Sequence, residues 1–366
     1  MKKAIFPRIL INQDKLIHNM NTVDFVCKKN NITVSGVIKG VNGNPLVLEC
    51  FLNSNIQHLA SSRLNQLQAI KAASPTTHTL ALRIPMLTEL EELVDVADCS
   101  LNSEMVTLRA LQKVSAKKAT QHEVLLMVDL GDLREGFFNE DDLLEAALFV
   151  EQDCPNLILK GIGTNLGCYG SITPDETNLG RLVSLAQTIE GKINRQLEWV
   201  SGGATTSLPL VLKGEMPQGI THLRIGDGIF LRDMEMYFDY TFDEMYGDVF
   251  ELQAQVVEVH EKPSYPIGTI SVDAFGNSPE YTDIGMRQRA LVGMGRQDIG
   301  DMTKLLPLDP GIKVIGGSSD HTILDITDAK EEIAVGDIIS FNIQYENLLF
   351  GFSSEYIHKI YAVEEE

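Results

Sequence analysis

The chain has 366 residues, of which 30 are Lys or Arg and 51 are Asp or Glu, so its formal charge is −21. At about 100–200 residues per domain, this length suggests two domains. A composition with 44% hydrophobic and 22% charged residues is that of a globular protein and excludes extensive disorder. The acidic balance argues against binding to duplex nucleic acid or to anionic membranes, because both require a basic face.

The sequence lacks the usual marks of membrane and secreted proteins. No run approaches the ~18 consecutive apolar residues of a membrane span. Pro7, Arg8 and Asn12 interrupt the apolar stretch that a signal peptide requires. Five cysteines are widely spaced and form no CxxC pair, which is typical of reduced thiols, most of them buried. We therefore expect a cytoplasmic protein.

Short β-type runs alternate with helical spacing between residues 11 and 235, with helices expected at 13–28, 141–150 and 175–192. We count eight strand–helix units, the number that a parallel (β/α)8 TIM barrel requires. An open doubly wound sheet, which usually has fewer units, is the alternative. The expected strands lie near residues 34–39, 57–61, 78–84, 99–101, 122–129, 157–164, 197–201 and 222–225.

The pattern changes after residue 235 to short β runs that Gly, Pro and Asp separate, with little helical spacing. This texture predicts a second, mostly β domain. The opening segment KAIFPRILI is also β-like and could pair with it. We therefore predict a barrel domain over 11–235 and a β domain over 236–366 that includes residues 1–10.

The reactive residues of parallel barrels collect at the C-terminal ends of the strands, so the residue after each expected strand is a candidate. Lys39 follows the apolar Val37 and Ile38 at the end of the first strand. An ammonium group there loses hydration, its pKa falls, and the amine then suits a Schiff base with an aldehyde cofactor. The alternative is a lysine that has passed the strand end and extends its amine into water.

The seventh expected strand leads into the glycine-rich turn SGGATTS, which begins at Ser201. The backbone N–H groups and threonine hydroxyls of such a turn can hold a phosphate, and barrels commonly bind phosphate at this position. An ordinary turn with an N-capping threonine is the alternative. Arg134 after the fifth strand and Arg224 in the eighth would reach the same mouth of the barrel and offer contacts to an anion or a ring. No metal-type histidine spacing and no GxSxG elbow occurs.

Taken together, these features resemble the alanine racemase family of pyridoxal phosphate (PLP) enzymes, and most closely its ornithine/alanine racemase-like branch. The resemblance implies a PLP cofactor and a homodimer with shared active sites. It also implies two-base interconversion of the L and D forms of a free amino acid: ornithine, another basic amino acid, or alanine. The segments that carry it extend over nearly the whole chain: VIKGVNGN, DLGDLREGF, SGGATTSLP, HLRIGDGI, SVDAFGN, GRQDIG and GSSDHTILD.

By position, the resemblance implies that Lys39 binds the cofactor aldehyde and acts as one proton-transfer base. Arg134 would contact the phenolic oxygen of the cofactor and the substrate carboxylate, and Asn165 stands where the family often has a histidine near the ring. Arg224 would hydrogen-bond the pyridine nitrogen, and an always-charged donor keeps that nitrogen unprotonated, which favours reprotonation over transamination. The residues implied at the phosphate are Ser201, Gly203, Thr205 and Thr206.

The second base departs from the family pattern. The family supplies a tyrosine from the β domain of the partner chain, in a GYxDG-like turn, whereas the corresponding turn here reads VDAFG and places Asp273 at that position. Asp273 is therefore the candidate base, with Tyr281 or Tyr345 as replacements, although Asp273 could instead cap a turn. Ser319 and Asp320 match a substrate-site segment of the same domain.

Related D-threonine aldolases and D-serine dehydratases share the barrel and the lysine but add a metal. Their PxHxC-like ligand segment has no counterpart here, where the chain reads NIQYENL, so we expect no metal. A PLP-dependent lyase remains the alternative activity. A non-catalytic PLP carrier is a further alternative, which the long β domain disfavours.

Overall fold

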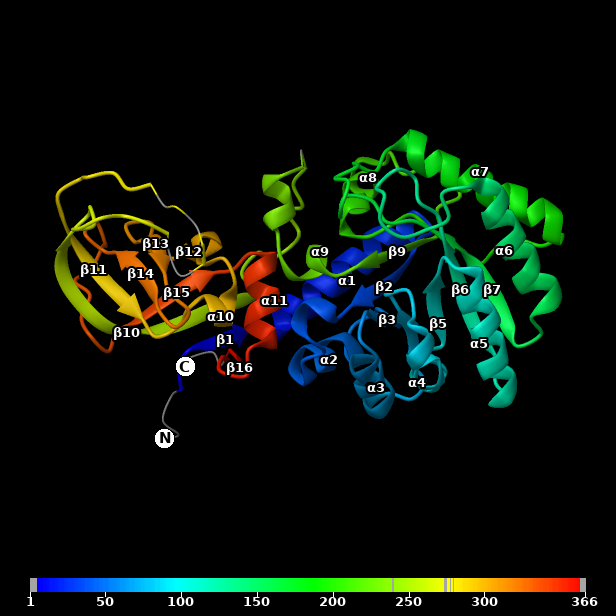
Figure 1. Cartoon of the computed structure of the whole chain (residues 1–366), viewed down its shortest axis with the longest axis horizontal. Helices are drawn as coiled ribbons and strands as arrows, with labels where there is room; N and C mark the ends of the chain where they lie inside the picture. The colour runs from blue at the N-terminus through cyan, green and yellow to red at the C-terminus, as the bar shows by residue number, and fades with distance from the viewer. Residues whose placement is uncertain (1–4, 239, 273–274, 277, 279, 363–366) are drawn as a thin grey trace. The chain divides into compact units, whose positions relative to one another are not determined.

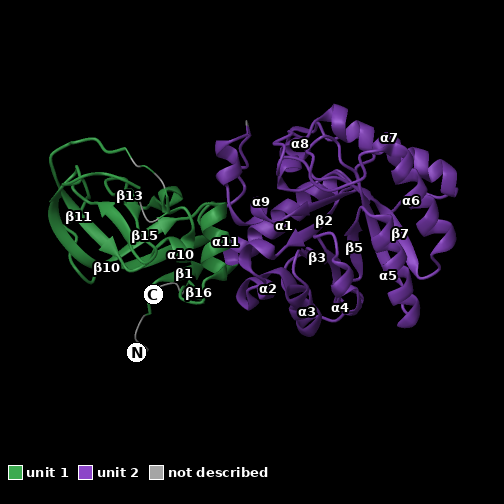
Figure 2. Ribbon diagram, viewed as in Figure 1, with its two compact units in different colours: residues 1–13, 247–366 green, residues 14–246 purple. Residues whose placement is uncertain are grey.

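The computed structural model describes residues 5–238, 240–272, 275–276, 278 and 280–362. The chain forms two compact units, one made by Asp14–Tyr246 and the other by the segments on either side of it (Figure 2). Both ends of the chain therefore contribute to the second unit.

The unit Asp14–Tyr246 is a closed parallel barrel surrounded by helices (Figure 1). The strands pair in chain order from β2 (Thr33–Val37) to β9 (His222–Ile225), and β9 closes the ring by pairing with β2. This closure confirms the predicted (β/α)8 barrel over an open sheet. The strands between them are β3 (His58–Ser61), β4 (His78–Ala81), β5 (Cys99–Asn102), β6 (His122–Met127), β7 (Leu157–Gly163) and β8 (Trp199–Ser201).

Helices cover the outside of the barrel because each has one apolar face. In α1, for example, Leu16, Met20, Val23 and Cys27 recur at helical spacing, and all four are buried. The helices of this unit are α1 (Gln13–Lys29), α2 (Pro45–Leu52), α3 (Leu64–Ala73), α4 (Leu90–Val96), α5 (Met105–Lys117), α6 (Glu140–Asp153), α7 (Glu176–Ile193), α8 (Leu208–Lys213) and α9 (Asp227–Phe230).

Polar aromatic side chains fill the N-terminal end of the barrel. Four histidines are the first residues of their strands: His58 of β3, His78 of β4, His122 of β6 and His222 of β9. Trp199, the first residue of β8, stacks on His222 with 4.0 Å between ring centroids and 3° between ring planes. This layer lies at the end of the strands opposite to the one where the sequence predicts chemistry.

The second unit is a mostly β domain, as predicted, built on the 14-residue strand β10 (Phe250–Pro263). β10 pairs antiparallel with β1, β11 and β15, and β1 pairs parallel with β16. The domain also contains the helix α11, which the sequence pattern did not indicate. Its elements are β1 (Arg8–Ile11), β11 (Met286–Val292), α10 (Arg296–Ile299), β12 (Leu306–Pro307), β13 (Lys313–Gly317), β14 (Thr322–Asp325), β15 (Ile338–Asn342), α11 (Tyr345–Ser353) and β16 (His358–Tyr361).

The described residues contain neither a membrane-spanning helix nor a disulfide. No helix among them is both long enough and apolar enough to cross a membrane. All five cysteines are free thiols; Cys168 is exposed and the other four are buried.

Candidate active site

Lys39 stands directly after the first barrel strand. β2 ends at Val37, and the chain turns through the short 3-10 helix η1 (Lys39–Val41) before α2. Ile38 is fully buried, and its backbone N–H donates to the carbonyl oxygen of Ala60 on β3 (3.0 Å). This anchor holds the backbone at the C-terminal mouth of the barrel, where Lys39 follows.

The surroundings of Lys39 favour its neutral amine. Its pKa is lowered, first because protein atoms displace water around the ammonium, and further by the positive charges of Arg134 and Arg224. Cys168 and Glu135 act in the opposite direction. Lys39 is nevertheless an exposed residue, as expected in the open mouth of a barrel.

Arg224 lies inside the barrel mouth with only 3% of its surface exposed. Its Nη2 donates to the carbonyl oxygen of Thr164 (2.7 Å) and to Oδ1 of Asn165 (2.7 Å), and its Nη1 donates to Oγ of Ser201. Burial lowers the pKa of Arg224 to about 10, so the guanidinium remains charged at neutral pH. Its Nε–H and one N–H of Nη1 have no hydrogen-bond partner within the described part of the chain.

A buried chain of hydrogen bonds supports Arg224 from the barrel interior. A guanidinium can only donate, so Oγ of Ser201 accepts from it and sends its own proton to Nδ1 of His222 (2.8 Å). Nε2 of His222 then carries the ring proton and donates to Oγ of Ser35 (2.8 Å). Burial, followed by the charge of Arg224, lowers the pKa of His222 well below its usual value, which agrees with this neutral form.

A second network joins the two arginines of the mouth. Nε of Arg134 pairs with Oε2 of Glu135 at 2.8 Å, and Oε1 of Glu135 accepts a hydrogen bond from Nδ2 of Asn165. Because Asn165 also accepts from Arg224, Glu135 and Asn165 connect Arg134 with Arg224. Glu135 was not among the site residues predicted from the sequence. The available signal was an acid directly after a candidate arginine in the segment LREGF.

Asp132 ties the loop after β6 to the loop after β7. Its buried carboxylate accepts the backbone N–H groups of Gly167 (3.1 Å) and Tyr169 (3.0 Å). Burial by itself would raise the pKa of Asp132, but these backbone hydrogen bonds outweigh it and the pKa is lowered. The two loops are thereby held together, which brings Arg134 and Asn165 into one site.

The turn after β8 has the features of a phosphate cradle. Gly203 has φ +112°, and a Cβ at this position would lie 2.9 Å from Oγ of Ser207, so the turn needs glycine. Oγ1 of Thr205 accepts from the N–H of Gly228, and Oγ1 of Thr206 donates to a carbonyl of the loop after β7. The backbone N–H groups of residues 204–206 have no partner among the described residues. Three neighbouring unpaired donors suit an anion.

The remaining predicted site residues belong to the β unit. Asp273 lies outside the described residues. Tyr281 is exposed, and Tyr345 is the half-buried first residue of α11. Oγ of Ser319 donates to Oδ2 of Asp320 (2.9 Å) in an exposed turn. The barrel unit thus brings together the candidates for cofactor binding, and the β unit carries those for the second base and the substrate contact.

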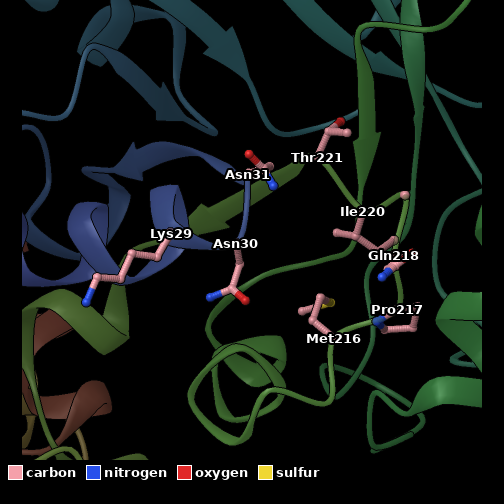
Figure 3. A pocket seen from close by; sticks show the side chains of 9 residues that line it. Lys29, Asn30, Asn31, Met216, Pro217, Gln218, Ile220 and Thr221 are labelled. Atoms are coloured by element: carbon pink, nitrogen blue, oxygen red, sulfur yellow. The ribbon is translucent and has the colours of Figure 1, made fainter.

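A cavity of about 510 Å³ opens at the other end of the barrel strands (Figure 3). Residues 29–31 and 216–221, which precede β2 and β9, line it. Lys29 extends away from Met216 and Pro217, and no side chain in the lining matches the chemistry at the Lys39 end (Figure 3). The Lys39 end therefore stays the candidate active site.

Similarity to known proteins agrees with this geometry. Residues 11–232 match the family described as alanine racemase, N-terminal domain. The chain is 42% identical to ornithine racemase from Acetoanaerobium sticklandii over 355 residues, which cover 97% of this chain and 99% of that protein. It is 35% identical to lysine racemase from Thermotoga maritima, with 98% of this chain and 99% of that protein covered.

Solved structures show the same fold at low identity. The alanine racemase from E. faecalis superimposes with a TM-score of 0.73 at 15% identity, covering 97% of this chain and 98% of that one. The barrel fold and the similarity over nearly the full length to two racemases identify the chain as an amino-acid racemase. The chain belongs to the alanine racemase family.

Proposed function

We propose that this amino-acid racemase uses PLP to interconvert the L and D forms of a basic amino acid, with ornithine as the first candidate. The racemase activity rests on similarity over nearly the full length to ornithine racemase and lysine racemase. Both of those names refer to basic amino acids, which supports the choice of substrate. The observation that carries the cofactor is the array at the barrel mouth, where Lys39 has a lowered pKa beside Arg134 and Arg224.

The donor groups of the mouth suit PLP. When bound, PLP supplies an aldehyde that condenses with amines and a ring that withdraws electrons from the α carbon of an amino acid. Lys39 would hold the aldehyde, and the unpaired N–H groups of Arg224 would face the ring nitrogen. Arg134, 41% exposed at its side chain, would meet the phenolic oxygen and the substrate carboxylate. Asn165 would lie beside the ring.

The turn after β8 would hold the phosphate group. Gly203, Thr205 and Thr206 offer it the required backbone conformation, unpaired N–H groups and two hydroxyls. The hydroxyl of Ser201 is already bonded to Arg224 and His222, so in this proposal Ser201 orients Arg224 instead.

Proton transfer needs one base on each face of the α carbon. Lys39 would serve one face, and its lowered pKa makes the neutral amine available nearer to neutral pH than for an ordinary lysine. Asp273, with Tyr281 or Tyr345 as replacements, is the candidate for the other face. We place this second base on the partner chain of a homodimer. In this arrangement residues 11–235 bind the cofactor, and residues 236–366 with 1–10 complete the site.

Heavy water separates the three candidate activities. Incubation of pure L-ornithine in heavy water should lead to loss of optical rotation with uptake of α-deuterium. A keto acid or aldehyde product would instead indicate a lyase, and no change at all would indicate a carrier. Parallel assays with lysine and alanine test the preference for basic amino acids.

Substitution of Lys39 tests the cofactor assignment directly. With PLP the protein should be yellow, with an absorbance band at about 420 nm that Lys39→Ala removes, because the chromophore needs this amine. Lys117→Ala is the matched control, since Lys117 pairs with Glu91 on the exposed surface. An unchanged spectrum in Lys39→Ala would refute the assignment.

A further inference from the structure

We propose that Glu135 is the positioning residue that holds both arginines of the site, and that only a carboxylate can do this at position 135. The inference rests on the proposed function, because that function gives Arg134 and Arg224 their roles. Glu135 occupies the centre of the chain of contacts that runs from Arg134 through Asn165 to Arg224. Its side chain is 16% exposed, against 41% for Arg134, so it forms the inner and better shielded end of that ion pair.

The donors and acceptors in this chain can be arranged in only one way. Nη2 of Arg224 can only donate, so the amide oxygen of Asn165 must face it, and the amide Nδ2 must then donate to Glu135. At the other end, the cationic guanidinium of Arg134 forms an ion pair with Glu135, with 2.8 Å between Nε and Oε2. Position 135 must therefore accept a hydrogen bond on one oxygen and pair with a guanidinium through the other, which a carboxylate does and an amide cannot.

The charge of Glu135 also acts on the lysine. The groups that act electrostatically on Lys39 are Arg134 and Glu135 from the loop after β6, Cys168 from the loop after β7, and Arg224 from β9. Glu135 raises the pKa of Lys39 while the two arginines lower it. It therefore limits how far the two arginines lower that pKa, in addition to orienting them.

Exchanging the carboxylate and the amide between positions 135 and 165 tests whether Glu135 positions the arginines or only contributes one contact. In Glu135→Gln the side-chain NH2 group of the new glutamine must face either the guanidinium of Arg134 or Nδ2 of Asn165. Both of these groups are donors, so one of the two contacts is lost in either orientation of the amide. Adding Asn165→Asp restores the pattern, because the new carboxylate accepts from Arg224 and from the amide at position 135, whose oxygen accepts from Arg134. The double variant keeps the net charge of the wild-type site. Glu140→Gln is the matched control. Glu140 lies five residues after Glu135 and forms an exposed ion pair with Arg181, which this substitution removes.

Three quantities should be measured on the full chain: KM, the pH of PLP uptake and the thermal midpoint. Glu135→Gln should still bind PLP, but its KM for the racemised amino acid should rise about tenfold or more, because Arg134 is no longer held. The pH at which half of the protein has taken up PLP should be lower than in the wild type, since the pKa of Lys39 falls when the carboxylate is lost. The thermal midpoint without PLP should also be lower. The double variant should return all three toward the wild type, and Glu140→Gln should leave KM and the uptake pH unchanged.

The outcomes that overturn the inference are distinct from those that overturn the function. If Glu135→Gln matches Glu140→Gln in KM and uptake pH, or if the double variant is no better than Glu135→Gln, then Glu135 does not position the arginines. A lower thermal midpoint without a change in KM or uptake pH would indicate a merely structural role. If the wild type takes up no PLP at Lys39, the proposed function fails, while the midpoints measured without PLP still test the donor–acceptor pattern.

Discussion

The buried histidines of the barrel should make the fold sensitive to acid. His122 is 1% exposed, and its Nε2 lies 2.8 Å from Oγ of Ser100. Burial lowers its pKa from 6.5 to about 4, although Glu123 and Asp98 oppose this shift. Above its unfolded pKa of 6.5 the histidine is neutral in both the folded and the unfolded chain, so the full stability of the fold is present there. That stability is lost as the pH falls from 6.5 toward 4, because the unfolded chain takes up the proton first.

The size of the effect follows from the two pKa values. At pH ~5, which is about 1.5 units below the unfolded pKa, the histidine of the unfolded chain is mostly protonated while that of the folded chain is mostly neutral. His122 alone therefore lowers the free energy of unfolding by about 2 kcal/mol. His58, with a pKa also lowered to about 4, and His222 act in the same direction. Because the whole domain is stable by only about 5–15 kcal/mol, this loss is large enough to measure.

Urea unfolding at two pH values tests the calculation. The sequence has one tryptophan, the buried Trp199 in the histidine layer, so its fluorescence reports the barrel itself. Between pH ~7.5 and ~5 the free energy of unfolding should fall in both proteins. The fall should be about 2 kcal/mol smaller in His122→Asn than in the wild type, because the variant lacks this buried histidine. His260→Gln, at an exposed position, is the control and should behave as the wild type. Equal pH dependence in the wild type and His122→Asn would refute the reasoning.

Three further outcomes are expected. Gly161→Ala should prevent normal folding, because its Cβ would collide with the backbone carbonyl of Trp199, whereas Gly180→Ala in open space on α7 should stabilise by about 0.5–1 kcal/mol; urea titrations compare the two, and equal stabilities would contradict this. Asp132→Ala should lose about 1–3 kcal/mol and raise KM, because three backbone N–H groups of the loop after β7 lose their acceptor; a wild-type KM would separate the loop from substrate binding. EDTA should leave activity unchanged, since no group of three His, Cys, Asp or Glu among the described residues could hold a metal; recovery on adding metal would favour the lyase.

The elements of the barrel could be predicted because their signals are local. Helices expected at 13–28, 141–150 and 175–192 are found at 13–29, 140–153 and 176–193, since apolar residues at helical spacing mark both the element and its buried face. The placement of Lys39 at a strand end followed from the same signals. The helix α11 was missed, because its Gly, Asn and aromatic residues are weak helix formers and burial of Leu348 and Phe352 decides its structure.

The connections within the site, by contrast, belong to the tertiary structure. The sequence by itself determined that a lysine, arginines and a glycine-rich turn follow barrel strands, because parallel strands bring their C-terminal ends to one face. Only the folded chain showed that Glu135 bonds Asn165, 30 residues away, and that His222 bridges to Ser35, 187 residues away. These contacts depend on how loops fold across the barrel mouth and on which acceptors remain there for donors of fixed geometry. No local pattern of residues encodes that arrangement.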